Sequence, residues 1–152
     1  MMHSVNRLFR EQSGSAVVEM ALVAPFLAAL LIGMVDLSRA YSTKLQVEQA
    51  AQRTVEKIQI SKYQPTDNTA LQAEAASAAG VSADNVTVSS WLQCNNNPEK
   101  LSFTSTCNGS EPYARYVSIR ITKSYTPVFP VKWDRTASGT WTVRGQAGVR
   151  VQ

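Results

Sequence analysis

The sequence predicts an α+β fold in which one long N-terminal helix, first transmembrane and then amphipathic, packs on a small antiparallel β-sheet. Residues 15–35 form an apolar run long enough to cross a membrane as a helix. Residues 47–58 continue that run with helical periodicity. Three segments within residues 85–151 alternate apolar and polar side chains, which is typical of strands that bury one face.

The apolar run carries one formal charge. Among its 21 residues, 15–35, Glu19 is the only acidic or basic side chain. The uninterrupted part, residues 20–35, is longer than the apolar core of about 7–15 residues in a secretory signal, and no convincing small-residue cleavage site follows it. We therefore expect a retained membrane helix, with a cleaved secretory signal as the alternative. A charge inside a membrane helix costs about 2.5–3.5 kcal/mol, which makes Glu19 a functional candidate.

Basic residues before the helix set its orientation. Arg7 and Arg10 precede it, and Glu11 is the only acidic residue beside them. This excess of basic residues places the N-terminus in the cytoplasm, so the rest of the chain is expected to be exported.

The two cysteines, Cys94 and Cys107, fall in the exported part. In an oxidising compartment a disulfide between them is expected, and two unrelated buried thiols are the alternative. Two thiols are too few for a structural zinc site, and the only histidine is His3, so no metal is expected.

The helical pattern runs on beyond the apolar segment. Val47, Ala51, Val55 and Ile58 recur at spacings of four, four and three, with polar residues on the other faces. Pro25 falls inside the membrane part, where it removes one backbone hydrogen bond. Lipid tolerates this when neighbouring helices cover the freed group.

The exported part divides into a short helix and three strands. Residues 70–79 are alanine-rich and end at Gly80, a suitable helix C-terminus. Residues 126–133 hold two prolines and cannot form a central strand. The strand candidates, chosen by alternation, are residues 85–92, 115–125 and 140–151.

Basic and aromatic residues gather toward the C-terminus. From Tyr113 onward there are seven lysines and arginines, and Asp134 is the only acidic residue. The whole chain has a net charge of +4. Nucleic acid or anionic lipid could be attracted there, but solvated strand faces are favoured because alternation disperses the charges. The aromatic residues form either a binding face or, as we favour, part of the core. They are Tyr113, Tyr116, Tyr125, Trp133 and Trp141.

Two stretches resemble a known family. They are Arg-Glu-Gln-Ser-Gly-Ser-Ala-Val-Val-Glu-Met-Ala-Leu-Val-Ala-Pro-Phe-Leu at residues 10–27 and Gly-Met-Val-Asp-Leu-Ser-Arg-Ala-Tyr at residues 33–41. Together they resemble TadE-like proteins of the tight adherence (Flp) pilus machinery, which are pseudopilins of the wider type IV pilin group. Residues 125–130 are similar to the family as well, although less specifically.

The resemblance implies a pilin-like fold and a processing site. Residues 1–14 would be a cytoplasmic prepilin leader, and an aspartyl prepilin peptidase of the bacterial inner membrane would cut between Gly14 and Ser15. Glu19 would then be the fifth mature residue, which acts in processing or assembly. Residues 15–35 would span the membrane, residues 36–60 would continue as the amphipathic helix, and residues 61–152 would form the periplasmic domain.

The chemistry of such a cut concerns Glu19 directly. Cleavage creates an α-amino group with a reference pKa of about 7.7–8.0, and Glu19 lies four residues along the helix, a rise of about 6 Å. Pairing of the amine and the carboxylate, within one chain or between subunits, offsets part of their desolvation cost and sets the register of assembly. The alternative is a carboxylate that extends to the nearby cytoplasmic interface.

These observations predict a minor pseudopilin that takes part in pilus assembly. Its expected partners are the prepilin peptidase, other pilins, the assembly platform and membrane lipid, without nucleic acid. The alternative is a single-pass, membrane-anchored binding domain that enters no filament. An enzyme is not expected, and neither is a cofactor, because the mature chain lacks histidine, a close acidic pair and a Gly-x-Ser-x-Gly motif.

Overall fold

The computed structural model describes residues 13–61, 64, 67–95, 97–128 and 140–151. It divides into two compact units, Met1–Ser38 and Arg39–Gln152. Helix α1, Ser13–Ile60, contributes to both. Arg7, Arg10 and most of the proline-containing segment at residues 126–133 lie outside the described residues.

In the first unit, α1 presents apolar side chains on all sides. Every described side chain from residue 16 to residue 35 is exposed. The exposed fraction is 72% for Phe26 and 66% for Leu30. The helix is long and apolar enough to cross a membrane, and it fits a single-pass membrane anchor.

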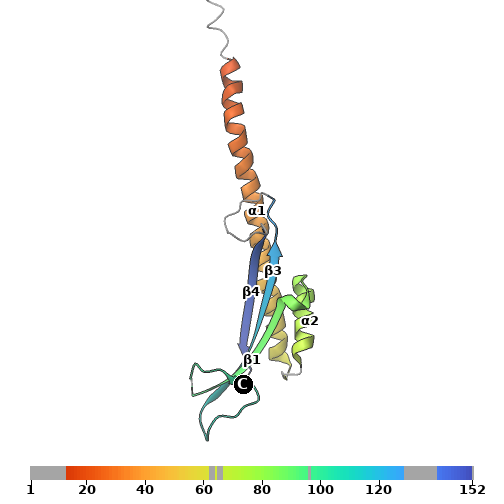
Figure 1. Ribbon diagram of the computed structural model, residues 1–152, viewed down its shortest axis with the longest axis vertical. Coiled ribbons are helices and arrows are strands. Elements are labelled where there is room, and N and C mark those ends of the chain that lie inside the picture. The colour runs from red at the N-terminus through yellow and green to blue at the C-terminus, as the bar shows by residue number, and fades with distance from the viewer. Residues whose placement is uncertain (1–12, 62–63, 65–66, 96, 129–139, 152) are drawn as a thin grey trace, which may run out of the picture. The chain divides into compact units, whose positions relative to one another are not determined.

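The second unit joins the end of α1 to a short helix and a sheet of four antiparallel strands in the order β2-β1-β3-β4 (Figure 1). This confirms the predicted α+β class and its three long strands. The two-residue strand β2 was not predicted because so short a segment shows no alternation. The remaining elements are α2 Asn68–Ala79, η3 Ala83–Asn85, β1 Val86–Cys94, β2 Leu101–Ser102, β3 Tyr113–Tyr125 and β4 Trp141–Arg150.

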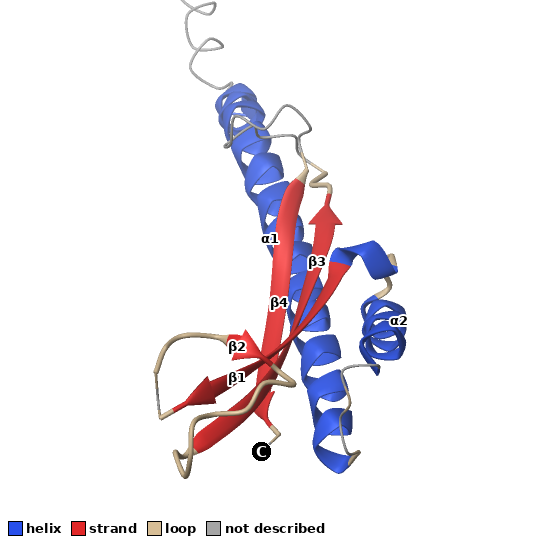
Figure 2. Ribbon diagram, turned by 60° about the horizontal axis from the view of Figure 1, so that its bottom comes forward, coloured by secondary structure: helices blue, strands red, loops and turns tan. Residues whose placement is uncertain are grey.

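Both helices of this unit cover the same face of the sheet (Figure 2). Alternation along the central strand β3 turns Val117, Ile119 and Ile121 toward them, and all three are fully buried. The predicted amphipathic stripe of α1 is confirmed, because it supplies the opposite side of this core. The core residues of the two helices are Val47, Ala50, Ala51, Val55, Ile58, Leu71, Ala75, Ala76 and Ala79.

Helix α1 and strand β4 lie close together at Gly145. A Cβ atom added to this glycine would lie 2.5 Å from the backbone carbon of Val47 and 2.7 Å from the backbone nitrogen of Glu48. Backbone atoms cannot move aside as a flexible side chain can, so only glycine fits here. The Nζ atom of Lys44 also donates to the carbonyl of Arg144, one residue away on β4. The helix therefore lies against the sheet backbone itself at this point.

Lys123 joins three elements on the covered face. Its ammonium group donates to Oε1 of Gln46 on α1, at 3.0 Å, and to the carbonyl of Ala79 at the end of α2, at 2.8 Å. Gly80 ends α2 in the left-handed conformation, as the sequence predicts. A cation at a helix C-terminus is favoured by the helix dipole, so Lys123 fixes α2 on the sheet.

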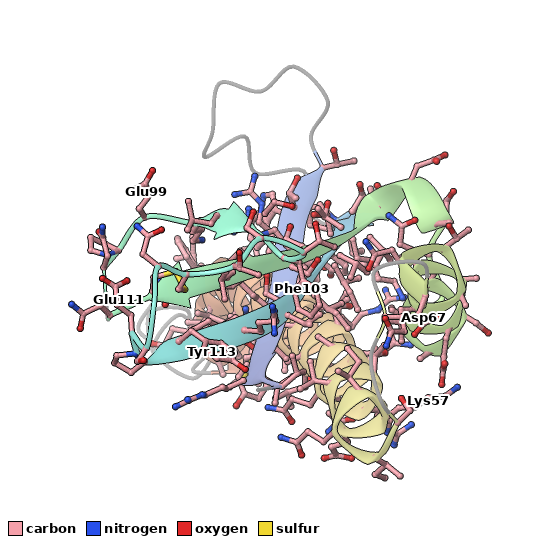
Figure 3. The ribbon with its side chains drawn as sticks, turned by 90° about the horizontal axis from the view of Figure 1, so that it is seen from below. Lys57, Asp67, Glu99, Phe103, Glu111 and Tyr113 are labelled. Atoms are coloured by element: carbon pink, nitrogen blue, oxygen red, sulfur yellow. A yellow bond between two sulfur atoms is a disulfide. The ribbon has the colours of Figure 1, made fainter. Side chains whose placement is uncertain are left out.

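The far end of β1 and β3 carries a lobe that is closed by a disulfide. Cys94 and Cys107 are bonded, with Cα atoms 5.7 Å apart. Arg115 holds the same lobe from β3, because its guanidinium group donates to the carbonyls of Phe103 and Ser105 at 3.0 and 3.3 Å. Figure 3 shows Phe103 and Tyr113 here, apart from Lys57 and Asp67 at the helices.

Replacement of Gly145 tests the close approach of helix and sheet. Gly145→Ala should lower the free energy of unfolding by about 1–3 kcal/mol, because the added methyl group forces two backbones apart. Gly148→Ala is the matched control in the same strand, since its Cβ would meet atoms no closer than 3.4 Å. Chemical denaturation measures both variants, and equal stabilities would contradict this account of the packing.

Loss of the disulfide should destabilise the lobe without removing the sheet. Cys94→Ser/Cys107→Ser removes the bond that restricts the unfolded chain between two positions 13 residues apart. The free energy of unfolding should therefore fall by about 3 kcal/mol. Arg115 retains its carbonyl contacts, so the circular dichroism of the strands should persist. A loss below about 1 kcal/mol, or loss of the strand signal, would contradict this assignment.

Candidate functional site

The predicted processing residues lie together at the start of α1. The helix begins at Ser13, so the Gly14–Ser15 peptide bond falls in its first turn. Glu19 follows one turn after Ser15 and is exposed. If the chain is cut between Gly14 and Ser15, Ser15 becomes the first helical residue and carries the new amine.

The start of a helix favours a carboxylate. The first N–H groups of α1 have no partner within the helix, and the helix dipole places partial positive charge there. The first turn of α1 holds no acidic residue. Glu19 is therefore the carboxylate of the described helix that lies nearest this end. A terminal amine at Ser15 would add a full positive charge to the partial one.

The residues around Glu19 form one apolar face of the helix. Phe26 and Gly33 follow it at spacings of seven, which place them on the same side of α1. A side chain added at Gly33 would meet nothing within 4 Å, so this position is open to close approach by another helix. This exposed face therefore carries the carboxylate of Glu19, the ring of Phe26 and, at Gly33, a position without a side chain.

Pro25 lies inside α1 without ending it. Because proline has no amide proton, the carbonyl of Ala21 lacks its usual donor four residues later. In a membrane this carbonyl needs a partner, since lipid supplies none. Pro25 faces a different side of the helix from Glu19, so the two features act in different directions.

Asp36 is a polar feature that the sequence analysis did not single out. Its exposed fraction is 6%, whereas its neighbours Val35 and Leu37 are 52% and 69% exposed. Carboxylates are rarely so buried. The sequence offered one signal for Asp36, which is its position directly after the apolar run. An acidic residue at the end of a membrane helix does not stand out, so the sequence analysis did not select it.

The predicted aromatic residues do not form one face. Tyr116 stacks on Trp91 on the sheet face away from the helices, with ring centroids 5.6 Å apart. Tyr125 is buried on the covered face and contacts Trp141 at 6.3 Å. Tyr113 contacts Arg115 in the lobe, and Trp133 lies outside the described residues. The core position that we favoured is confirmed for Tyr125, whereas Tyr116 packs on Trp91 outside the core.

The described residues of the second unit include potential metal ligands and a pocket. The cysteines and acidic residues in the described part of this unit do not gather in groups of three that could hold a metal ion. A pocket of about 410 Å³ opens beside the disulfide and is lined by Leu92, Glu111, Tyr113 and Arg115 among others. Arg115 already donates to the carbonyls of Phe103 and Ser105 in the lobe there.

Comparison with known proteins gives one match. The model of the family described as TadE-like protein matches residues 14–55. No curated protein and no solved structure matches the chain. The matched segment holds Gly14, Glu19 and Pro25 and extends into the helix that covers the sheet, whereas the sheet itself lies outside it. The N-terminal segment of this chain, residues 14–55, is therefore TadE-like, as its resemblance to that family indicated.

Proposed function

We propose that this protein is a minor pseudopilin that takes part in assembly of a tight adherence (Flp) pilus after a prepilin peptidase removes residues 1–14. The TadE-like match indicates involvement in the assembly of such pili. The observation that carries the finer proposal is Glu19, a carboxylate on an exposed apolar helix, one turn after the Gly14–Ser15 bond.

The apolar surface of α1 requires partners in two settings. In the membrane, lipid covers the exposed side chains of residues 16–35. In a filament, only the corresponding helices of other subunits can cover them. Burial of each large apolar side chain is worth about 1.5–3 kcal/mol, so extraction from lipid without helix packing is prohibitive.

Glu19 gives this non-directional packing a register. Apolar contacts alone allow neighbouring helices to slide along each other. A carboxylate that must meet a terminal amine in a dry environment permits one offset, because an unpaired charge costs several kcal/mol there. The face formed by Glu19, Phe26 and Gly33 is our candidate for this contact.

The inner membrane is the proposed location, with the N-terminus in the cytoplasm and the sheet in the periplasm. The cytoplasmic peptidase would then reach the Gly14–Ser15 bond at the membrane surface. A single-pass anchored domain that enters no filament remains the second candidate, because the helix fits an anchor equally well.

Intact-mass spectrometry separates the two candidates. Protein recovered from membranes of the native host should begin at Ser15, and protein from a peptidase-deficient strain should retain residues 1–14. A Met1 terminus in both strains would favour the anchored binding domain.

Substitution of Glu19 tests the register contact. Glu19→Ala should insert in the membrane normally, while its co-precipitation with partner pilins should fall about tenfold, which corresponds to loss of about 1.4 kcal/mol. Val17→Ala is the control, since Val17 is an exposed residue on the opposite side of the helix.

The mature terminus of both variants is measured in the same samples, so a processing defect is distinguished from an assembly defect. Normal filaments with Glu19→Ala would contradict the register role. Glu19→Asp, which keeps the charge, should restore part of the co-precipitation.

A further inference from the structure

Exposed apolar side chains of the second unit gather at one of its ends. Six large apolar side chains are exposed among its described residues. Two of them stand apart, Ile60 at the end of α1 and Tyr113 in the lobe. The other four belong to the part of α1 with which this unit begins and to the adjoining ends of β3 and β4. We call these four residues, Tyr41, Leu45, Val128 and Trp141, the apolar end.

Helix α1 and strand β4 run side by side in the same direction through this unit (Figure 2). Nζ of Lys44 donates to the carbonyl of Arg144. Further along both elements, the backbone of Val47 lies against Gly145. The residues that precede these contacts in α1 and in β4 therefore lie at the same end of the unit.

The two exposed rings of the apolar end lie on the same side of the sheet. Tyr41 and Trp141 each precede the contact between Lys44 and Arg144 by three residues. Residues three apart on a helix are neighbours on its surface, so Tyr41 lies on the flank of α1 toward β4. The ring of Trp141 contacts Tyr125 on the face that the helices cover. The exposed fraction is 64% for Tyr41 and 39% for Trp141, so solvent reaches both rings.

The chain itself limits the distance between the apolar end and a bilayer that α1 crosses. Six residues of helix separate Val35, the last residue of the apolar run, from Tyr41, which corresponds to about 9 Å. The polar layer on each side of the hydrocarbon core is roughly 5–8 Å thick. Three residues cover about 10 Å in a strand but only about 4.5 Å in a helix, so Trp141 extends farther toward the start of this unit than Tyr41 does. Both rings therefore come within reach of the lipid head groups.

The residue types of the apolar end are those of a membrane interface. Tryptophan and tyrosine are enriched at the level of the head groups, because each combines an apolar ring with a polar group that stays hydrated. The segments that form this end, residues 39–47, 122–128 and 140–146, contain no aspartate or glutamate. Glu48 lies at their border and is paired with Lys44 at 2.7 Å. No carboxylate among these residues therefore opposes contact with an anionic surface.

Exposed arginines add positive charge at this end. Arg39 lies on α1, two residues before Tyr41, and Arg144 lies on β4. Strand register places Arg120, Arg144 and Arg150 on the sheet face away from the helices, and Arg144 is the one nearest to Trp141. Anionic lipids attract basic residues that lie close to a membrane surface.

From these observations we infer that the apolar end rests on the head groups of the bilayer that α1 crosses, with the ring of Trp141 in the head-group layer. The inference rests on the anchor role of α1 within the proposed function. Because α1 keeps this end close to lipid, even weak contacts with the head groups are formed for much of the time. The sheet domain is then held at the membrane surface, and a subunit that enters a filament has to break this contact.

Fluorescence of single tryptophans measures the contact. The full-length protein is reconstituted in vesicles of phosphatidylethanolamine and phosphatidylglycerol that contain a lipid with a spin label on its head group. In Trp91→Phe/Trp133→Phe, Trp141 is the only tryptophan. The labelled lipid should quench most of its emission, because a spin label quenches only rings that lie near it.

The matched control is Trp133→Phe/Trp141→Phe, in which Trp91 is the only tryptophan. Trp91 pairs with Tyr116, and Trp141 pairs with Tyr125 nine residues farther along β3. The two indole rings are therefore about 30 Å apart along the sheet. The emission of Trp91 should not change when the labelled lipid is added.

A further substitution tests whether the neighbouring ring takes part. In the protein with Trp141 alone, Tyr41→Ser should lower the ratio of domain held at the surface to domain released about threefold, which corresponds to about 0.7 kcal/mol. Ile60→Ser removes an exposed apolar side chain at the other end of α1 and should leave the quenching unchanged. Unfolding curves of all variants show that the fold persists.

Flotation of the protein with the vesicles is measured in the same samples. Protein that stays out of the vesicles would overturn the anchor and this inference together. Protein that floats while both tryptophans are quenched equally, or not at all, would overturn this inference and leave the pilus function standing. A change in Trp141 emission that follows protein density rather than labelled lipid would assign the apolar end to a second copy, which also overturns it.

Discussion

One continuous helix has to satisfy two different environments, and the rest of the molecule follows from this constraint. In its first part α1 exposes apolar side chains on every side, and in its second part it buries a single stripe. The stripe lies against the sheet, and at Gly145 the backbone of Val47 leaves no room for a Cβ atom.

The sheet domain divides its cations between structure and surface. Lys123 and Arg115 are used within the fold, where each donates to backbone carbonyls. Arg120 and Arg144 face outward on strands that contain no acid. Neighbouring positive charges cost stability.

Much of the fold is predictable from the sequence because its signals are periodic. Val47 to Ile58 repeat with the period of a helix, and residues 117, 119 and 121 repeat with the period of a strand, so both buried faces could be named in advance. The close approach at Gly145 could not, because a glycine in a strand does not reveal which backbone lies beside it. The contacts of Arg115 with the carbonyls of Phe103 and Ser105 depend likewise on tertiary structure.

The processing residues Gly14, Ser15 and Glu19 stay a prediction, which rests on a different kind of signal. A lone glutamate in an apolar helix conflicts with its surroundings, and such conflicts mark function more reliably than regular patterns do. The common face of Arg120, Arg144 and Arg150 was missed, since it depends on strand register rather than on spacing within one strand.

Solid-state NMR on assembled filaments tests the central claim most directly, through the dipolar coupling between a ¹⁵N label at the Ser15 amine and a ¹³C label at the Glu19 carboxylate. The account predicts a separation within about 4 Å, as in an ion pair. A carboxylate that is protonated, or far from every terminal amine, would contradict it.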